Sequence, residues 1–283
     1  MKPAPFAFVR PRTLEEALAA LSEEPGAKVL AGGQSLVPLL SMRLAAPSML
    51  VDINGIPDLG HVAVDASGVR IGALARHSEV LASAEAAESQ PLLAMALSNV
   101  AHPTIRNRGT TVGSLVHADA AAEMPMVLRL LGGSVDVASV RGRRTISAAK
   151  LFAGPLESTL AHDEIAVEAF IPALPAGAGV AFEEIARRHG DYALAGVAAY
   201  VECTADEVLA ARVGFVSVSD VPTVVDVVDA VREEGADPAD AALAELDPAA
   251  DIHASADYRA HLVRVLTLRV LGAAITHARE RTP

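Results

Sequence analysis

The chain of 283 residues is long enough for two domains, each with its own buried core. Its 35 acidic and 23 basic residues give a formal charge of -12, which disfavours nucleic acid and anionic membranes as partners. Hydrophobic residues make up 52% of the chain, yet no apolar run approaches the roughly 18 residues of a membrane span, and the N-terminus lacks the apolar core of a signal peptide. We therefore expect a cytoplasmic protein without a membrane span.

The first half of the chain predicts two units of mixed helix and strand. Thr13 and Glu16 have the capping-box pattern ahead of a leucine-spaced helix, and the alternating residues after His61 predict a hairpin. The first unit, about 1–57, contains a helix over 14–22, a strand over 27–30, a short helix after Ser35 and a strand over 49–53. The second, about 58–175, contains a hairpin over 61–74, helices at 78–84, 91–99 and 123–131, a hairpin over 134–148 and a strand over 164–172, with 101–125 expected as an ordered loop.

A proline- and glycine-bearing run at 172–179 predicts a linker to a second domain. The fold class is therefore α+β, with one domain over 1–175 and another over 176–283. The second domain is expected to contain three antiparallel strands, at 180–188, 192–203 and 208–218, followed by helices near 224–234, 239–246 and 257–280.

The single cysteine and the scattered histidines exclude most metal chemistry on this chain. Cys203 alone can form neither an internal disulfide nor an iron–sulfur cluster with cysteine ligands from this chain only. The nine histidines show no spacing that puts two ligands on one helix face, so no metal site is expected. No Ser–His–Asp arrangement or carboxylate pair stands out either, and no catalytic residue is assigned.

The stretch AGGQSL, residues 31–36, joins a predicted strand to a predicted helix. Glycine takes positive φ and has no Cβ, so successive N–H groups here can turn toward one spot and bind an anion such as a diphosphate. If Ser35 opens a helix, the free amides of its first turn add to that spot. Neither GxGxxG nor GxxxxGK[ST] is present, so the common nucleotide motifs are not supported. The alternative is that Gly32 and Gly33 only make a tight turn.

A second polar, glycine-bearing loop strengthens the ligand hypothesis. Thr110, Thr111, Gly113 and Ser114 lie within five residues, and Asp119 and Glu123 follow as acceptors suited to sugar or ribityl hydroxyls. The alternative is structural: Thr110 and Ser114 cap turns, and the charge of Glu123 stabilises the start of a helix. Nearby, His102 and Arg106 either touch phosphate or fix the loop, and His77 is interpreted as a polar residue near a helix start.

These motifs resemble the two flavin-binding signatures of the FAD subunit of molybdenum hydroxylases, the xanthine dehydrogenase and carbon monoxide dehydrogenase group. The signatures are AGGQSL and HPTIRNRGTTVGSLVHADAAAEMP. Later parts of that family are similar to three further stretches: PLESTLAHDEIAVEAFIP, RRHGDYALAGVAA and DIHASADYRAHLVRVLTLRVL. The resemblance implies a two-lobed FAD-binding domain of the vanillyl-alcohol oxidase (PCMH) type. It also implies a smaller α+β C-terminal domain of the carbon monoxide dehydrogenase flavoprotein type, with a three-stranded antiparallel sheet and helices.

The resemblance further implies which residues hold FAD. The diphosphate would be surrounded by Ala31, Gly32, Gly33, Gln34, Ser35 and Leu36, and the second loop would be formed by Ala101, Thr110, Gly113 and Ser114. Glu123 would lie near the ribityl chain and Ile165 near the ring system. Tyr192 would reach the isoalloxazine from the C-terminal domain. Gly33→Val is expected to place methyl groups where the diphosphate approaches.

This sequence departs from the family pattern at two positions that bear on the site. Val112 stands where the family usually has a glycine, which leaves the contacts of Thr111 and Val112 open. Glu183 stands where some relatives carry a lysine near the flavin, and no role is transferred to it. Arg187, Arg188 and His189 form a basic cluster that is either a solvated strand end or a docking site for a partner subunit.

By the same resemblance, the chain is an FAD-carrying electron-transfer subunit. It would take electrons from [2Fe–2S] clusters on a small subunit and pass them to an external acceptor, while a large subunit carries molybdopterin and oxidises the substrate. The complex would be a dimer of heterotrimers. Two alternatives stay open: a stand-alone FAD-dependent oxidase or dehydrogenase of the vanillyl-alcohol oxidase fold, and a non-catalytic module that binds a diphosphate ligand.

Overall fold

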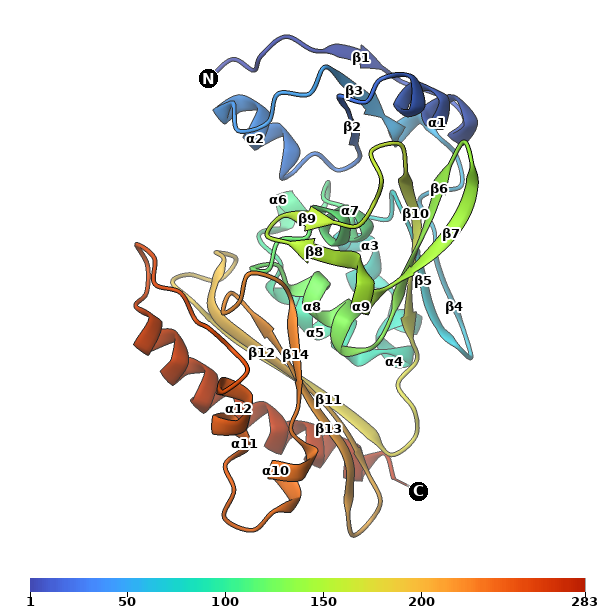
Figure 1. Ribbon diagram of the computed structural model, residues 1–283. Coiled ribbons are helices and arrows are strands. Elements are labelled where there is room, and N and C mark those ends of the chain that lie inside the picture. Colours follow the sequence, from blue (N-terminus) through green and yellow to red (C-terminus); the bar gives the residue numbers. More distant parts are fainter. Residues whose placement is uncertain (283) are drawn as a thin grey trace.

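A three-stranded parallel sheet organises the first lobe of the computed structural model, which describes residues 1–282 (Figure 1). Helix α1 begins as predicted, because the Thr13 hydroxyl accepts from the Glu16 amide at 3.2 Å and the Glu16 carboxylate accepts from the Arg12 amide at 2.8 Å. The strands are β1 (Ala7–Val9), β2 (Ala27–Leu30) and β3 (Met49–Asp52), in the order β1-β3-β2, and the helices are α1 (Leu14–Glu23), α2 (Leu36–Met42) and the short 3₁₀ helix η1 (Ile53–Gly55).

A five-stranded antiparallel sheet forms the second lobe, with β10 at its centre. The two predicted hairpins lie on either side of this strand, in the order β4-β5-β10-β6-β7. The strands are β4 (Val62–Asp65), β5 (Gly68–Gly72), β6 (Ser134–Ser139), β7 (Gly142–Ser147) and β10 (Ile165–Pro172); a small pair, β8 (Phe152–Gly154) and β9 (Glu157–Ser158), precedes β10. The helices are α3 (His77–Ala82), α4 (Ala84–Ser89), α5 (Pro91–Asn99), α6 (Pro103–Arg106), α7 (Thr111–His117), α8 (Glu123–Leu130) and α9 (Ala148–Leu151).

The segment 101–125 is ordered as expected, but describing it as a loop was wrong, because it contains α6 and α7. Both helices are short, with four and seven residues, so neither displays the repeated apolar spacing by which a longer helix is recognised. Helix α7 begins at a side-chain cap: the Thr110 hydroxyl accepts from the Gly113 amide at 3.2 Å.

The C-terminal region is a four-stranded antiparallel sheet covered by a long helix. The three predicted strands are present, and β14 extends the sheet by pairing with β13. The helix expected over 224–234 is correspondingly shorter, because the β-branched residues at its start lie in β14. The strands are β11 (Ala178–Ala186), β12 (Ala193–Cys203), β13 (Val208–Val216) and β14 (Thr223–Asp226), and the helices are α10 (Val228–Arg232), α11 (Pro238–Leu243) and α12 (Ala256–Glu280).

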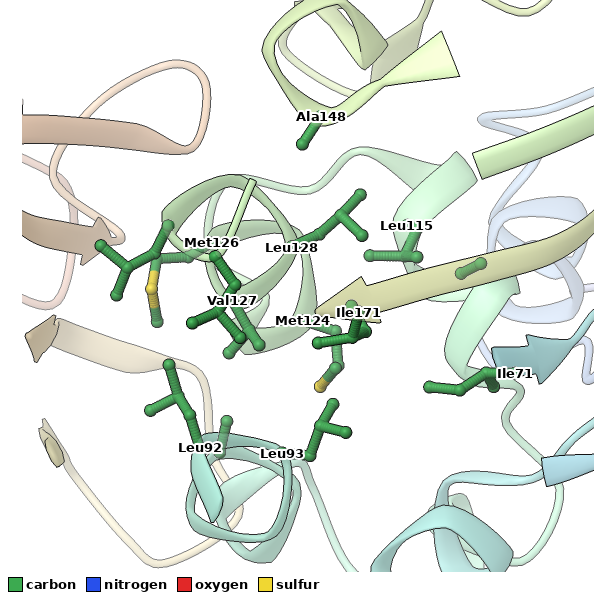
Figure 2. Packing of buried hydrophobic residues seen from close by; sticks show 14 of the residues in the cluster. Ile71, Leu92, Leu93, Leu115, Met124, Met126, Val127, Leu128, Ala148 and Ile171 are labelled. Atoms are coloured by element: carbon green, nitrogen blue, oxygen red, sulfur yellow. The ribbon is translucent and has the colours of Figure 1, made fainter. Parts of the chain in front are cut away.

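Helix α8 joins the second lobe to the C-terminal sheet. Its residues Met124, Met126, Val127 and Leu128 are fully buried, and Figure 2 shows them between α5, β10 and the neighbouring elements. On the other side, a Cβ at Gly214 of β13 would lie 2.8 Å from the Met126 sulfur, so glycine is needed for this close approach. One hydrophobic core therefore runs from the second lobe into the C-terminal sheet. Within residues 1–282, none of the helices has the length and apolar character needed to cross a membrane.

Candidate functional site

A cavity of about 590 Å³ is lined by both lobes and by the loop between β11 and β12. Every residue that the sequence analysis assigned to the cofactor lies on its wall: Ala31, Gly32, Gly33, Gln34, Ser35, Leu36, Ala101, Thr110, Gly113, Ser114, Glu123, Ile165 and Tyr192. These residues come from the first lobe, the second lobe and the C-terminal region. The structure thus brings the predicted set together around one space, while their contacts with a cofactor stay a prediction.

The first loop exposes a row of backbone donors to this cavity. Gly33 has a φ of +71°, which turns the chain after β2. Within the described chain, the amides of Gln34, Ser35 and Leu36 donate to no protein acceptor, and the hydroxyl of Ser35, which precedes α2, accepts no capping hydrogen bond. The Gln34 side-chain amide is held by the Gly32 carbonyl at 3.1 Å. Unused amides beside a cavity are the arrangement that binds a diphosphate.

The surroundings of Gly33 add a further reason why Gly33→Val should be harmful, while the approach of its methyl groups to a diphosphate stays a prediction. A Cβ at Gly33 would lie 3.1 Å from Leu30 Cδ1 and 3.2 Å from Val37 Cγ2, between apolar side chains. What requires glycine here is the positive φ, because side chains with a Cβ are strained in that region. The motif singled out this position but could not show which atoms a side chain there would meet.

Gly32 is where the first loop meets the second. A Cβ at this residue would lie 2.4 Å from the Arg108 carbonyl oxygen, 2.8 Å from Gly109 Cα and 2.9 Å from the Thr110 amide nitrogen. All three atoms belong to the backbone, which cannot rotate out of the way as a side chain could. The two positions therefore need glycine for different reasons: close approach between the loops at Gly32, and backbone conformation at Gly33.

In the second loop, the structural alternative for Thr110 is confirmed, since its hydroxyl caps α7. A Cβ at Gly113 would lie 2.5 Å from that same hydroxyl oxygen, so glycine makes the cap possible. Val112 is helical and does not have the positive φ that would demand glycine. Thr111 is fully buried and, unlike Val112, does not line the cavity. The substitution of valine for the family's glycine is therefore compatible with the loop.

His77 is a cavity residue that the sequence analysis interpreted only as a polar residue near a helix start. It is 5% exposed, and its Nδ1 lies 3.2 Å from the Thr111 hydroxyl oxygen. Burial, together with the positive charge of Arg106, lowers the pKa of His77 to about 4, so the ring is neutral at physiological pH. No local pattern could have identified it, because its partner is 34 residues away.

The loop around Ala101 is fixed by Arg106 and approached by the C-terminal region. Arg106 donates from Nη1 to the carbonyls of Val100 and Ala101 at 2.8 and 2.9 Å, which supports its interpretation as a residue that fixes the loop. Ala101 itself has a φ of +45°. A Cβ at Gly190 would lie 2.6 Å from the His102 ring and 2.8 Å from the Ala101 carbonyl oxygen, so the 187–192 loop packs directly on this segment.

Carboxylates gather at the part of the cavity near the C-terminal sheet. Glu123, at the start of α8, is 8% exposed; burial, then the charges of Glu184 and Asp119, raise its pKa to about 8. Burial also raises the pKa of Glu184 on β11 to about 7, and its Oε2 is buried without a hydrogen-bond partner among the described residues. Tyr192 is 66% exposed beside them, and partial burial with the charges of Asp119 and Glu123 raises its pKa.

The other residues that the sequence analysis singled out lie outside the cavity wall. Glu183 accepts from Arg269 of α12 at 2.8 Å, so its carboxylate is engaged on the helix side of the sheet. Neighbouring side chains of a strand point to opposite faces, which explains why Glu184 and not Glu183 interacts with Glu123. The cluster Arg187, Arg188 and His189 is exposed at the end of β11, with Arg187 3.5 Å from Asp191.

The chemistry of the cavity fits FAD. Free amides and the Lys28 side chain suit a diphosphate, carboxyl groups suit the hydroxyls of a ribityl chain, and Ile165, Leu156 and Leu160 offer apolar walls to a flat ring. The comparison with family models decides the matter: the FAD binding domain in molybdopterin dehydrogenase matches residues 4–174, and the CO dehydrogenase flavoprotein C-terminal domain matches residues 180–274. This chain belongs to that FAD-binding family of molybdopterin dehydrogenases.

Relatives within the family match along nearly their whole length. The nicotine 6-hydroxylase medium subunit of Paenarthrobacter nicotinovorans is 41% identical, over 96% of this chain and 98% of the relative. The 6-hydroxypseudooxynicotine dehydrogenase complex subunit alpha of the same species is 40% identical, over 99% and 97%. Among solved structures, quinoline 2-oxidoreductase from Pseudomonas putida 86 superposes with a TM-score of 0.91 at 36% identity, over 99% of this chain and 100% of that chain.

These matches confirm the family, the α+β fold class and the FAD cofactor that the motifs indicated. The chain is the FAD-binding medium subunit of an oxidoreductase of the molybdenum hydroxylase type. The family explains why no catalytic residue was found: bound FAD supplies the redox chemistry, and the protein supplies binding, orientation and electrostatics.

Proposed function

We propose that this subunit transfers electrons through FAD held in the cavity between its lobes. The electrons come from [2Fe–2S] clusters on a small partner subunit and leave to an external acceptor, while a large partner subunit carries molybdopterin and oxidises the substrate. The observation that carries the proposal is the single cavity that gathers free loop amides, apolar walls and carboxyl groups from both lobes and the C-terminal region.

Each part of the cavity wall has a separate task in this proposal. The amides of Gln34, Ser35 and Leu36 bind the diphosphate, and the hydroxyls of Thr110 and Ser114 support it from the second loop. The buried carboxyl of Glu123 binds the ribityl chain, Ile165 contacts the ring system, and Tyr192 covers the ring from the C-terminal loop. His77, being neutral, adds no charge beside the second loop.

The remaining parts of the proposal concern organisation. We keep the division of the chain into an FAD-binding domain over 1–175, with subdomains about 1–57 and 58–175, and a C-terminal domain over 176–283. The assembled enzyme is a dimer of heterotrimers in the cytoplasm. Substrate choice lies on the large subunit, because this chain has no role in substrate oxidation.

Spectroscopy of the purified chain and of the reassembled enzyme tests the proposal. The chain alone takes up FAD and shows flavin absorbance; in the complex, substrate reduces the iron–sulfur clusters first and the flavin afterwards. Gly32→Ala keeps cluster reduction by substrate and loses reduction of the external acceptor. A chain that never binds FAD contradicts the proposal, and flavin reduction in a complex without the small subunit favours a stand-alone oxidase.

A further inference from the structure

The two cofactor loops belong to different lobes and meet at Gly32. Gly32 of the first lobe lies against the backbone of residues 108–110 of the second. A backbone contact of this kind repels when the loops approach further but does not hold them together. Apolar packing joins the two lobes away from this contact, and polar groups beside the loops fix their separation there.

Asn54 of η1 provides the connection on the side of the first lobe. Its side-chain amide donates to the Ala31 carbonyl at 2.8 Å, directly at the start of the glycine loop. Asp52 orients it, because one carboxylate oxygen accepts from the Asn54 backbone amide at 3.0 Å and from its side-chain amide at 2.7 Å. Because these bonds occupy the side-chain NH2 group, the Asn54 side-chain oxygen faces the second lobe.

Arg76 provides the connection on the side of the second lobe. It donates from Nη2 to the Asn54 side-chain oxygen at 2.8 Å and from Nη1 to the Arg108 carbonyl at 2.7 Å. Its own backbone is fixed, since the Arg76 amide donates to Glu79 at 2.7 Å and Arg76 forms an isolated antiparallel bridge with Thr110. One guanidinium group thus spans both lobes with two separate donors.

We propose that Arg76 and Asn54 form an interlobe clamp that sets the distance between the two cofactor loops and so controls the retention of FAD. Neither residue is among those that line the cavity, so both are positioning residues that act through Ala31 and Arg108. The inference rests on the proposed function for its ligand. The clamp requires arginine in particular, because only its planar fork presents two donors in fixed directions, whereas lysine has a single charged nitrogen.

The first test measures FAD dissociation from the full chain by the recovery of free flavin fluorescence. Arg76→Lys, Arg76→Gln and Asn54→Ala are each expected to release FAD about tenfold faster than the wild type. The double variant Arg76→Gln with Asn54→Ala releases it no faster than the more severe single variant, because the two residues act as one unit. Release rates that add independently overturn the clamp.

A matched control separates the clamp from a general loss of stability. Arg70 is also half-buried in the second lobe, with its Nη1 3.1 Å from Glu168, its guanidinium over the Phe170 ring, and no part in the cavity wall. Arg70→Gln lowers the melting temperature of the apo chain about as much as Arg76→Gln and leaves the release rate unchanged. Equal release rates in Arg70→Gln and Arg76→Gln overturn the proposal.

Hydrogen exchange in the apo chain tests the clamp without FAD, so its result does not depend on the proposed function. The amides of Thr111 and Gly113 are hydrogen-bonded, to the Ala75 carbonyl and the Thr110 hydroxyl. Arg76→Gln and Asn54→Ala accelerate exchange at both amides, whereas Arg70→Gln does not. If the wild type fails to bind FAD, the proposed function fails while this readout still decides whether the clamp exists; unchanged exchange in all three variants refutes it.

Discussion

The two ends of the cavity differ in the polar groups that line them. At the loop end, free backbone amides on a glycine-bearing loop are joined by hydroxyls and by Lys28, and no side chain there has to change its charge. At the sheet end, the cavity wall carries the carboxyl of Glu123, whose pKa is raised by burial and by the charge of nearby Glu184. The loop end should therefore be sensitive to a single added carbon atom and insensitive to pH, whereas the sheet end should show the reverse.

The strongest challenge to the loop end is Gly32→Ala. The added Cβ meets backbone atoms that can move only with the whole second loop, so we expect a cost of about 3 kcal/mol in the free energy of unfolding and complete loss of FAD. Chemical denaturation and flavin absorbance measure the two effects. Gly60→Ala is the control, because a Cβ at Gly60 has no neighbour within 4 Å. A stable, flavin-loaded Gly32→Ala protein would contradict the close contact between the loops.

The sheet end is tested by the pH dependence of stability. Folding raises the pKa of Glu123 from its ordinary value of 4.5 to about 8, so the folded state holds the extra proton between these values. Stability from this group is fully present below pH 4.5 and is lost as the pH rises toward 8. In apo Glu123→Gln, we expect the loss of stability over this pH range to be smaller than in the wild type by about 5 kcal/mol, measured by denaturation at several pH values.

The matched control for that titration is Glu183→Gln. Glu183 lies next in sequence to Glu184 and is paired with Arg269 on the other face of the sheet. We expect its variant to keep the pH profile of the wild type. Profiles that change equally in Glu123→Gln and Glu183→Gln would show that overall charge, and not the buried carboxyl, determines the effect.

A smaller effect separates the two glycines of the first loop. Gly33→Ala forces a side chain into a φ of +71°, with an expected cost of about 1.5 kcal/mol. Gly33→Asn should cost less, because asparagine tolerates this conformation better than alanine although its side chain is larger. Denaturation of both variants decides the matter: a greater cost for asparagine would mean that space, and not backbone conformation, governs this position.

The smallest effect is expected at Thr110. Thr110→Ala removes the cap of α7 and should cost about 1 kcal/mol, with weaker but measurable FAD binding. Thr110→Ser keeps the hydroxyl and serves as the control, with binding near that of the wild type. Titration of the apo chain with FAD measures the difference, and identical affinities for the two variants would assign Thr110 no role in the loop.

The contrast between the two ends also explains what the sequence could predict. Gly32, Gly33 and Ser35 lie within four residues of one another, so their motif was visible without the fold. The proximity of Glu123 and Glu184 depends on α8 packing against the C-terminal sheet, across more than sixty residues of chain, and no local pattern contains it. His77 and Thr111 are separated in the same way. Motifs therefore located the cavity, whereas the charges and burial within it required the structure.

Short elements were the other limit of the sequence analysis. Helices α6 and α7 have too few residues for a periodic pattern, and β14 begins a run of valines that continues into α10. Two of these elements are fixed by partners distant in sequence. Strand β14 pairs with β13, and the start of α7 is held by the hydrogen bond from the Thr111 amide to the Ala75 carbonyl. Tertiary contacts overrode local propensity at these places.

The packing of Gly190 against Ala101 has a consequence for how the enzyme is made. The ribosome releases both cofactor loops well before the 187–192 segment, because synthesis runs from the N-terminus. The wall formed by Gly190, Asp191 and Tyr192 is therefore the last part of the cavity to be synthesised. Because the core of the second lobe also continues into the C-terminal sheet, a complete cavity requires nearly the whole chain.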